Sequence, residues 1–309
     1  MLRTHMLLFS FAWAADVCQS WSTDATTTEL GDLSVESSGI VESPVEAGLF
    51  YSLDDAGNDA VLHLFTLEGS VEGNQTIEGA ENVDWEDLGS GPCVGGVEGE
   101  ACLYIADIGD NNKERDSITL YLVPASRAVS AAATACTMRY ANGEKQDAEA
   151  LLVSPDGTVR IVTKEAEGDA KIYRLDAPPC EGDGLLVEEA ELNLSGDAEE
   201  DRKVTAGAMS ADGSMVVLRS YSQAWLWRGC SLDWGAEPEM LDLGAQPLGE
   251  AIAFTADGAL VTSSEGNPFR VWELPCLETA ELTCPTCGCG EGSSWLILGV
   301  LGMWRRRRS

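Results

Sequence analysis

The chain is poor in basic residues, and this shortage excludes two classes of partner. It carries 19 Lys and Arg against 52 Asp and Glu, a formal net charge of −33, and four of the Arg residues stand in the last five positions. Binding to nucleic acid or to an anionic lipid surface needs clustered Lys and Arg. We therefore expect no nucleic-acid partner, and cations or cationic partners fit this composition better.

Histidine is almost absent, and common catalytic motifs are missing. The only two histidines are His5, near the N-terminus, and His63, inside the apolar stretch VLHLFTL. The sequence has no Gly-x-Ser-x-Gly motif, no Gly-rich phosphate loop and no dinucleotide fingerprint. These absences argue against nucleophilic catalysis and against nucleotide binding.

Apolar residues at helical spacing are also lacking, and a repeated strand pattern takes their place. Three segments align without gaps: DAEALLVSPDGTVRIVT, TAGAMSADGSMVVLRS and GEAIAFTADGALVTSSEG. In each, an apolar strand enters a Ser/Thr-Pro/Ala-Asp-Gly turn, where Gly supplies positive φ, and a second strand follows. Two more units match loosely. The five units start near Gly39, Trp85, Ala148, Ala206 and Gly249, at spacings of 43 to 63 residues.

This repeat predicts an all-β chain folded as a β-propeller with five recognisable four-stranded blades, six being the alternative count. Fourth strands are expected at TACTMRYANG, LVEEAELNLSG and EMLDLGA. The segment TTTELGDLSVESSG, before the first unit, is expected to complete the last blade and close the ring, since an open ring exposes strand edges. A β-sandwich also has many short strands, but it would not repeat one turn in every unit.

The first residues are typical of an export signal. Residues 1–15 contain Arg3, an apolar run too short to span a bilayer and the small-x-small sequence Ala-Trp-Ala, which predicts a signal peptide. A lipoprotein would be processed at Cys18, but Asp16 and Val17 precede it where small residues are needed. We expect residues 16–283 to form the propeller domain of an exported protein and residues 284–309 to form a C-terminal tail.

Export places the ten cysteines in an oxidising compartment, where disulfides are expected. Cys93 and Cys102 flank a Gly-rich loop between two strand-like segments, which predicts a disulfide that closes a hairpin. Three pairings stay open among four other cysteines, namely Cys136, Cys180, Cys230 and Cys276. A zinc site at CPTCGCG is the alternative for the tail cysteines, but no second Cys or His pair follows it.

Several motifs resemble those of a group of secreted bacterial propeller proteins without an agreed activity. They are NVDWEDLG, LYIADIGDNNKERDSITLYLVP, DAEALLVSPDG and GEAIAFTADG, and the likeness covers roughly residues 38 to 275. More distantly the chain is similar to phytase-like and calcium-dependent lactonase-type propellers, whose channels hold metal through acidic residues. The resemblance implies a propeller fold and a cation in its channel.

Glutamates recur where the innermost strands begin. Glu86, Glu149 and Glu250 fall at the same place in three units, and Gly39 and Gly207 occupy it in the other two. Because innermost strands line a propeller's channel, the glutamates are expected to converge at one mouth. Raised pKa values, pairing with Lys164 and Arg219, or a bound cation such as Ca²⁺ would each relieve their repulsion. The alternative is structural, with each carboxylate accepting backbone hydrogen bonds from a neighbouring blade.

Further charged residues stand where the second strands end and are expected near the same mouth, namely Asp54, Asp55, Asp107, Asp110 and Glu265 with Lys164 and Arg219. Asp107 is predicted to join the three glutamates as a metal ligand, and Lys164 and Arg219 are predicted to contact an anionic substrate. The loop DIGDNNKERD fails the calcium-loop pattern, because it has Arg115 and no glycine at the sharp turn, and is expected to be a polar turn.

Two functions follow from these features. The first is a cell-surface or secreted propeller that binds or scaffolds a surface ligand or protein, with a cation in its acidic channel. The second is a calcium-dependent phytase-like or lactonase-like hydrolase, for which the sequence assigns no catalytic residue. Recurrent tryptophans at positions 85, 225, 227 and 272 are expected to pack between blades rather than to hold a sugar.

The chain ends in CGCGEGSSWLILGVLGMWRRRRS, whose apolar run is too short for a lasting membrane anchor. The order of its parts resembles the MYXO-CTERM sorting tails of myxobacterial surface proteins, with Cys287 and Cys289 carrying the cysteine motif. That resemblance implies membrane attachment through the tail until a sorting protease cleaves it, and then display at the cell surface. An ordinary short anchor is the alternative.

Overall fold

The computed structural model describes residues 13–95, 99–165, 169–196 and 200–284. Many of its strands are buried on both faces. In β8 (Ala101–Asp107), Leu103 and Ile105 pack toward one neighbouring sheet, whereas Tyr104 and Ala106 pack toward the other. Side chains in a strand alternate between faces, so continuous apolar runs fit sheets that are covered on both sides. The predicted all-β fold is confirmed, because the described ranges contain no helix beyond the 3-10 turn Glu200–Arg202.

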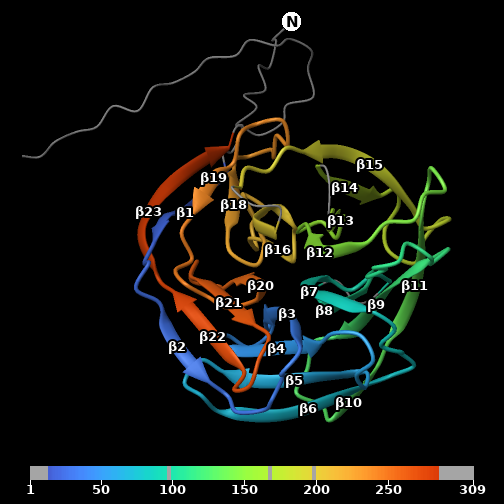
Figure 1. The fold of residues 1–309 in the computed structure, drawn as a ribbon, viewed down its shortest axis with the longest axis horizontal. Coiled ribbons are helices and arrows are strands. Elements are labelled where there is room, and N and C mark those ends of the chain that lie inside the picture. Colours follow the sequence, from blue (N-terminus) through green and yellow to red (C-terminus); the bar gives the residue numbers. More distant parts are fainter. Residues whose placement is uncertain (1–12, 96–98, 166–168, 197–199, 285–309) are drawn as a thin grey trace, which may run out of the picture.

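The described strands form five four-stranded antiparallel blades around a central axis (Figure 1). Their innermost strands are β3 (Ser37–Glu42), β7 (Trp85–Pro92), β12 (Ala148–Val153), β16 (Ala206–Met209) and β20 (Gly249–Phe254). The second strands are β4 (Leu49–Asp54), β8, β13 (Val159–Thr163), β17 (Met215–Arg219) and β21 (Leu260–Ser264). The third are β5 (Val61–Thr66), β9 (Ile118–Pro124), β14 (Ala170–Leu175), β18 (Ala224–Arg228) and β22 (Arg270–Leu274). The outermost are β6 (Val71–Glu78), β11 (Thr134–Tyr140), β15 (Leu185–Leu192), β19 (Glu239–Leu241) and β2 (Thr26–Glu29).

The ring is closed. Each innermost strand contacts the next, in the order β3, β7, β12, β16, β20 and back to β3. The last blade takes its outer strand from the N-terminal segment, because β2 pairs antiparallel with β22. The expected closing strand therefore lies where the sequence placed it, and so do the fourth strands β11, β15 and β19.

The repeated turns fold as the sequence predicts. Gly157, Gly213 and Gly258 have φ of 83°, 72° and 86°, and each donates its amide to the residue that opens its turn, at 2.8, 2.8 and 3.0 Å. A residue with a Cβ is disfavoured at such φ values, which explains why Gly ends each turn.

Five apolar clusters fill the spaces between neighbouring blades. Trp85 packs between the first two blades, Trp225 and Trp227 between the third and fourth, and Trp272 between the fourth and fifth. These four side chains are at most 8 % exposed, which confirms that they pack between blades. Large aromatic side chains bury the most apolar area per residue and so contribute strongly to the ring's stability.

Outer strand edges are at least partly paired in three of the blades. The short strand β10 (Ser130–Ala132) pairs parallel with β6, and β11 pairs parallel with β15, so the second and third blades join at their rims. Paired edges cannot template association with another chain.

Two terminal strands pair outside the ring, β1 (Trp13–Trp21) with β23 (Cys276–Cys284), and a disulfide joins Cys18 to Cys276. The predicted disulfide Cys93–Cys102 is confirmed. The expectation that Cys276 pairs within its group of four was wrong, because Cys18 lies opposite it across these terminal strands. A further disulfide joins Cys136 to Cys180, and Cys230 is disulfide-bonded as well.

These disulfides indicate an oxidising, extracytoplasmic compartment. The described residues contain no helix long and apolar enough to cross a bilayer. Residues 1–12 of the predicted signal peptide, and the predicted sorting cysteines Cys287 and Cys289 with the rest of residues 285–309, lie outside the described residues.

Candidate metal centre at the channel mouth

A β-bulge places the channel glutamates. In β7, β12 and β20 the pairing register slips by one residue at the start of the strand, and the extra residues are Glu86, Glu149 and Glu250. A bulge re-aims the side chain of its unpaired residue, and bulges often stand beside functional sites. The three glutamates therefore share one place in their blades, as the repeat predicted.

The equivalent residue of the first blade is Ser38 rather than Gly39, because the slip in β3 falls between Ser37 and Gly39. The Ser38 hydroxyl donates to the backbone oxygen of Glu86 at 2.6 Å and lies 3.2 Å from its Oε2. The alignment of the repeats placed Gly39 opposite the glutamates, and only the register of β3 and β4 shows that the bulged residue is Ser38.

Three carboxylates come together at this mouth: Asp55 after β4, Asp84 before β7, and Glu86. Oxygen atoms of the three lie within 4.8 Å of one another. None of them forms an ion pair with a Lys or Arg of the described ranges. Gly109 lines the group closely, and a Cβ there would collide with the carboxylates of Glu86 and Asp84. A group of three hard oxygen ligands, none of them in an ion pair within the described ranges, fits a cation.

Burial and mutual repulsion make the charged form of this triad costly. Burial, followed by the charge of Asp55, raises the pKa of Asp84 to about 6. Burial, followed by the charges of Glu149 and Asp55, raises the pKa of Glu86 well above its ordinary value. The pKa of Asp55 is also raised, chiefly by burial. A bound divalent cation would reverse all three effects, since it favours the charged form of each carboxyl.

Glu149 lies at the same mouth but is bound to Lys164. The Lys164 ammonium donates to Glu149 Oε1 at 2.7 Å and lies 5.2 Å from the ring centre of Tyr221. Burial raises the pKa of Glu149 to about 8 although Lys164 opposes the shift. Lys164 also lowers the pKa of Asp55, Glu86 and Glu250 through its charge, so its ammonium is a positive charge that the whole mouth shares.

Glu250 has no hydrogen-bond or ion-pair partner among the described residues, although only 6 % of it is exposed. Burial, followed by the charge of Glu149, raises the pKa of Glu250 to about 9. At neutral pH this carboxyl is therefore protonated and can donate a hydrogen bond.

Arg219 is buried beneath the mouth, with 1 % exposed. Its guanidinium donates to the backbone oxygens of Ser220 and Ala251 at 3.1 and 3.0 Å, and to Gln246 Oε1 at 3.3 Å. Burial lowers the pKa of Arg219 to about 10, while Glu250 opposes the shift. These donors fasten β17 to the fifth blade, and the predicted contact of Arg219 with an anionic substrate stays a prediction.

Asp107 lies beside the triad and is bound to Arg115. Arg115 Nη1 lies 2.8 Å from Asp107 Oδ1, and the backbone amide of Asp84 donates to the same oxygen at 3.1 Å. Asp110, in the next turn, accepts the amides of Glu114 and Arg115 at 2.8 Å each. The DIGDN loop is thus a hydrogen-bonded polar turn, and Asp107 lies outside the three-carboxylate group.

Asp87 crosses the channel below the mouth, and the sequence analysis did not single it out. It is fully buried, and its carboxylate accepts the amides of Leu88, Leu151 and Gly207 at 2.8, 2.7 and 3.3 Å. These amides belong to the innermost strands of three blades, so one side chain ties three blades together. Burial raises its pKa well above the ordinary value. The signal was present as the last residue of DWED, but the sequence does not show which acidic residue faces the channel.

His63, inside the apolar stretch VLHLFTL, is held by two side chains. Its Nε2 lies 3.0 Å from Asp54 Oδ2 and its Nδ1 lies 3.0 Å from Asn74 Oδ1. Both ring nitrogens are thus occupied, and neither is left to activate a nucleophile.

The raised pKa values predict that stability falls as pH rises. The folded state retains protons on Glu149 and Glu250 between their ordinary pKa of 4.5 and about 8 to 9, whereas the unfolded state has lost them. Because the folded state binds more protons in this window, the free energy of unfolding decreases with pH across it. We expect a lower Tm at pH 8.5 than at pH 5.5 in the presence of a chelator. The double variant Glu149→Gln, Glu250→Gln should flatten this dependence, and an unchanged slope would contradict it.

No protein-family model and no curated protein sequence matches this chain. Among solved structures, that of luciferin-regenerating enzyme is similar, with a TM-score of 0.48 and 11 % identity over 82 % of this chain and 96 % of that one. The strand pairing described above, rather than this likeness, establishes the blade arrangement.

Proposed function

We propose that this chain is an exported binding module that holds a divalent cation, Ca²⁺ in particular, between Asp55, Asp84 and Glu86. The observation that carries the proposal is the approach of three carboxylates to within 4.8 Å without a Lys or Arg paired to any of them in the described ranges. Hard cations take oxygen ligands, and calcium accepts irregular sets of six to eight. Backbone carbonyls and water would complete its coordination.

The sequence predicted Glu149, Glu250 and Asp107 as ligands, but in this proposal they do not bind the cation. Glu149 is held by Lys164, Asp107 by Arg115, and Glu250 is a neutral acid at pH 7. These three residues contribute to the electrostatic potential at the mouth, whereas the cation binds Asp55, Asp84 and Glu86.

The proposal places the propeller outside the cell, at the surface. The disulfides support an oxidising compartment. Surface display, membrane attachment through the tail and processing by a sorting protease rest on the sequence resemblance of residues 287–309. The ligand that such a module would bind is a surface partner or protein.

A calcium titration followed by thermal melting tests the site. At a calcium concentration 100 times Kd, binding should stabilise the fold by about 2.7 kcal/mol, which raises Tm by about 5 to 10 °C. The double variant Asp84→Asn, Glu86→Gln should lose the response. The charge-matched control Asp183→Asn, Glu237→Gln changes two exposed carboxylates and should retain it. A melting curve that calcium leaves unchanged in the wild-type chain would sink the proposal.

A second candidate, a calcium-dependent hydrolase of phosphate esters or lactones, is favoured by Glu250. A buried carboxyl with a pKa of about 9 and no described partner can donate a proton to a leaving group near the cation. A screen of phosphate esters and lactones with calcium distinguishes the candidates. Turnover that disappears in Glu250→Gln, with calcium binding intact, would establish the hydrolase, and absence of turnover would leave the binding module.

A further inference from the structure

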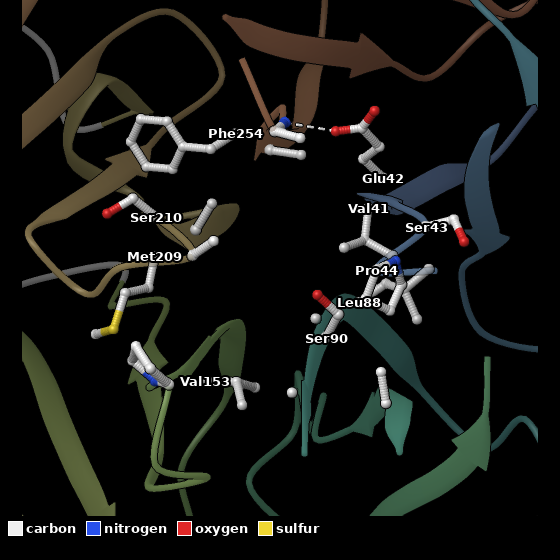
Figure 2. Close-up of a pocket in the computed structure, with 18 of the residues that line it drawn as sticks. Val41, Glu42, Ser43, Pro44, Leu88, Ser90, Val153, Met209, Ser210 and Phe254 are labelled. Carbon is white, nitrogen blue, oxygen red and sulfur yellow. Dashed lines mark hydrogen bonds between the residues drawn. The ribbon is translucent and has the colours of Figure 1, made fainter. Parts of the chain in front are cut away.

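The opposite end of the channel holds a pocket of about 650 Å³ (Figure 2). The glutamates stand where the innermost strands begin, and this pocket is lined where the same strands end and by the turns that follow them. Asp87 lies between the two, since Leu88, Leu151 and Gly207, whose amides it accepts, are pocket-lining residues. The pocket is therefore separate from the candidate metal centre. Its volume is within the range of pockets that bind small molecules.

Each blade contributes apolar side chains to the pocket. Figure 2 labels one from each innermost strand around the hollow, namely Val41 of β3, Leu88 of β7, Val153 of β12, Met209 of β16 and Phe254 of β20. Binding of an apolar ligand removes the surface of these side chains from water, which is favourable. The hollow fits an apolar ligand body about the width of an alkyl chain or a single ring.

The charge of the lining has one sign. It includes no Lys, Arg or His, and its ionisable residues are Glu42, Glu46 and Glu100. Glu46 is paired with Arg127 at 2.7 Å. Glu42 is held by backbone amides instead, accepting Gly48 at 2.7 Å on Oε1 and Ala256 at 2.6 Å on Oε2. Figure 2 shows the second of these bonds on the side of the pocket that also carries Phe254.

Glu42 is thus a fixed carboxylate at the edge of an apolar pocket, with no Lys or Arg paired to it in the described ranges. Its oxygens retain lone pairs beyond the two amide bonds, because a carboxylate has about four acceptor positions. The aromatic ring of Phe254 adds a negative face to the same region. An anionic ligand would meet repulsion here, and it would also approach a chain with a formal net charge of −33.

We propose that this pocket binds a small organic cation with an apolar body, such as an alkyl- or arylammonium compound. The ammonium group contacts Glu42, and the body lies within the ring formed by Val41, Leu88, Val153, Met209 and Phe254. This site is independent of the proposed function, because it uses none of the three carboxylates at the opposite mouth.

Three probes of equal length and different charge test the proposal by calorimetry at pH 7.5, namely octylammonium, octanol and octanoate. Octylammonium should bind with a Kd below 1 mM, about tenfold tighter than octanol, and octanoate should show no binding. Equal binding of octylammonium and octanoate would overturn the assignment of a cation. Absence of octylammonium binding would overturn the site itself.

Two kinds of variant locate the probe. Met209→Trp and, separately, Ser90→Trp fill the pocket and should abolish octylammonium binding, provided that melting confirms a folded chain. Glu42→Gln should weaken octylammonium about tenfold and leave octanol unchanged. Val187→Trp, on the rim strand β15, is the control and should bind as the wild type does. Binding that persists in both filled variants would contradict the location.

The outcome can be separated from that of the metal site. Octylammonium binding should be the same in excess chelator and in excess calcium, and the same in Asp84→Asn, Glu86→Gln. If calcium binding fails and octylammonium binding holds, only the proposed function is lost. If octylammonium instead competes with calcium, the probe occupies the acidic mouth, and the pocket proposal is wrong.

Discussion

Replacing Cys18 and Cys276 together by Ala should lower the free energy of unfolding by about 5.5 kcal/mol, the value that loop entropy gives for a loop of this length. This disulfide joins residues 258 apart in the sequence, so it restrains nearly the whole unfolded chain. It also fastens β1 to β23 beside the blade that the N-terminal strand β2 completes. Guanidinium unfolding, with and without the substitutions, measures the loss.

The double variant Cys93→Ala, Cys102→Ala is the matched control. Its disulfide closes a separation of 9 residues, and the same loop-entropy relation predicts a loss of about 2.5 kcal/mol. Loss of the wide disulfide should therefore cost about 3 kcal/mol more than loss of the narrow one. Equal losses, or the reverse order, would show that loop entropy does not govern the stability of this ring.

Asp87→Ala should cost about 3 to 5 kcal/mol of unfolding free energy. The substitution leaves the amides of Leu88, Leu151 and Gly207 without their acceptor in a fully buried place, and each buried unpaired donor costs about 1 to 3 kcal/mol. Because these amides belong to three blades, we expect the loss in the global unfolding transition rather than in a local one. Urea unfolding followed by circular dichroism measures it.

Two variants accompany the Asp87 measurement. Asp87→Asn retains one acceptor oxygen and should lose about half as much as Asp87→Ala. Asp176→Ala removes an exposed carboxylate that accepts one amide, from Leu185 at 3.2 Å, and should change stability by less than about 1 kcal/mol. If Asp87→Ala is as mild as Asp176→Ala, Asp87 does not hold the ring together.

The blades could be predicted from the sequence because their physics is local. A Gly at positive φ ends each of the turns SPDG, SADG and TADG, and strands with two buried faces flank it. The closing strand β2 was also predictable, since a missing fourth strand at one end of the chain implies one at the other.

The site was predicted in part, because it depends on register and on distant partners. The repeat identified the shared position of Glu86, Glu149 and Glu250. Only the register of the strand pairs shows that each of these residues lies in a β-bulge. Asp55 was expected near the glutamates from its place at the end of a second strand, whereas Asp84 was not singled out, and no spacing in the sequence reveals that these two carboxylates approach Glu86. Likewise Arg115 neutralises Asp107, and Cys18 pairs with Cys276, only through contacts that the ring creates.

The pairing of Glu149 with Lys164 shows a further limit of sequence reasoning. Pairing with Lys164 was one of the expected ways to relieve the carboxylates' repulsion, but the two residues were also assigned separate roles, as a metal ligand and as an anion contact. Lys164 Nζ lies 2.7 Å from Glu149 Oε1, so each charge is largely compensated by the other. Among the described residues, Asp55, Asp84 and Glu86 are the carboxylates that approach one another at this mouth without an ion pair.

An anomalous difference map from crystals of this chain grown with Tb³⁺ or Mn²⁺ in place of Ca²⁺ tests the metal centre most directly. We expect one strong peak within coordination distance of oxygens from Asp55, Asp84 and Glu86. The peak should be absent in the Asp84→Asn, Glu86→Gln variant. No peak at this mouth in the wild-type chain, or a strong peak only at another place, would contradict the account.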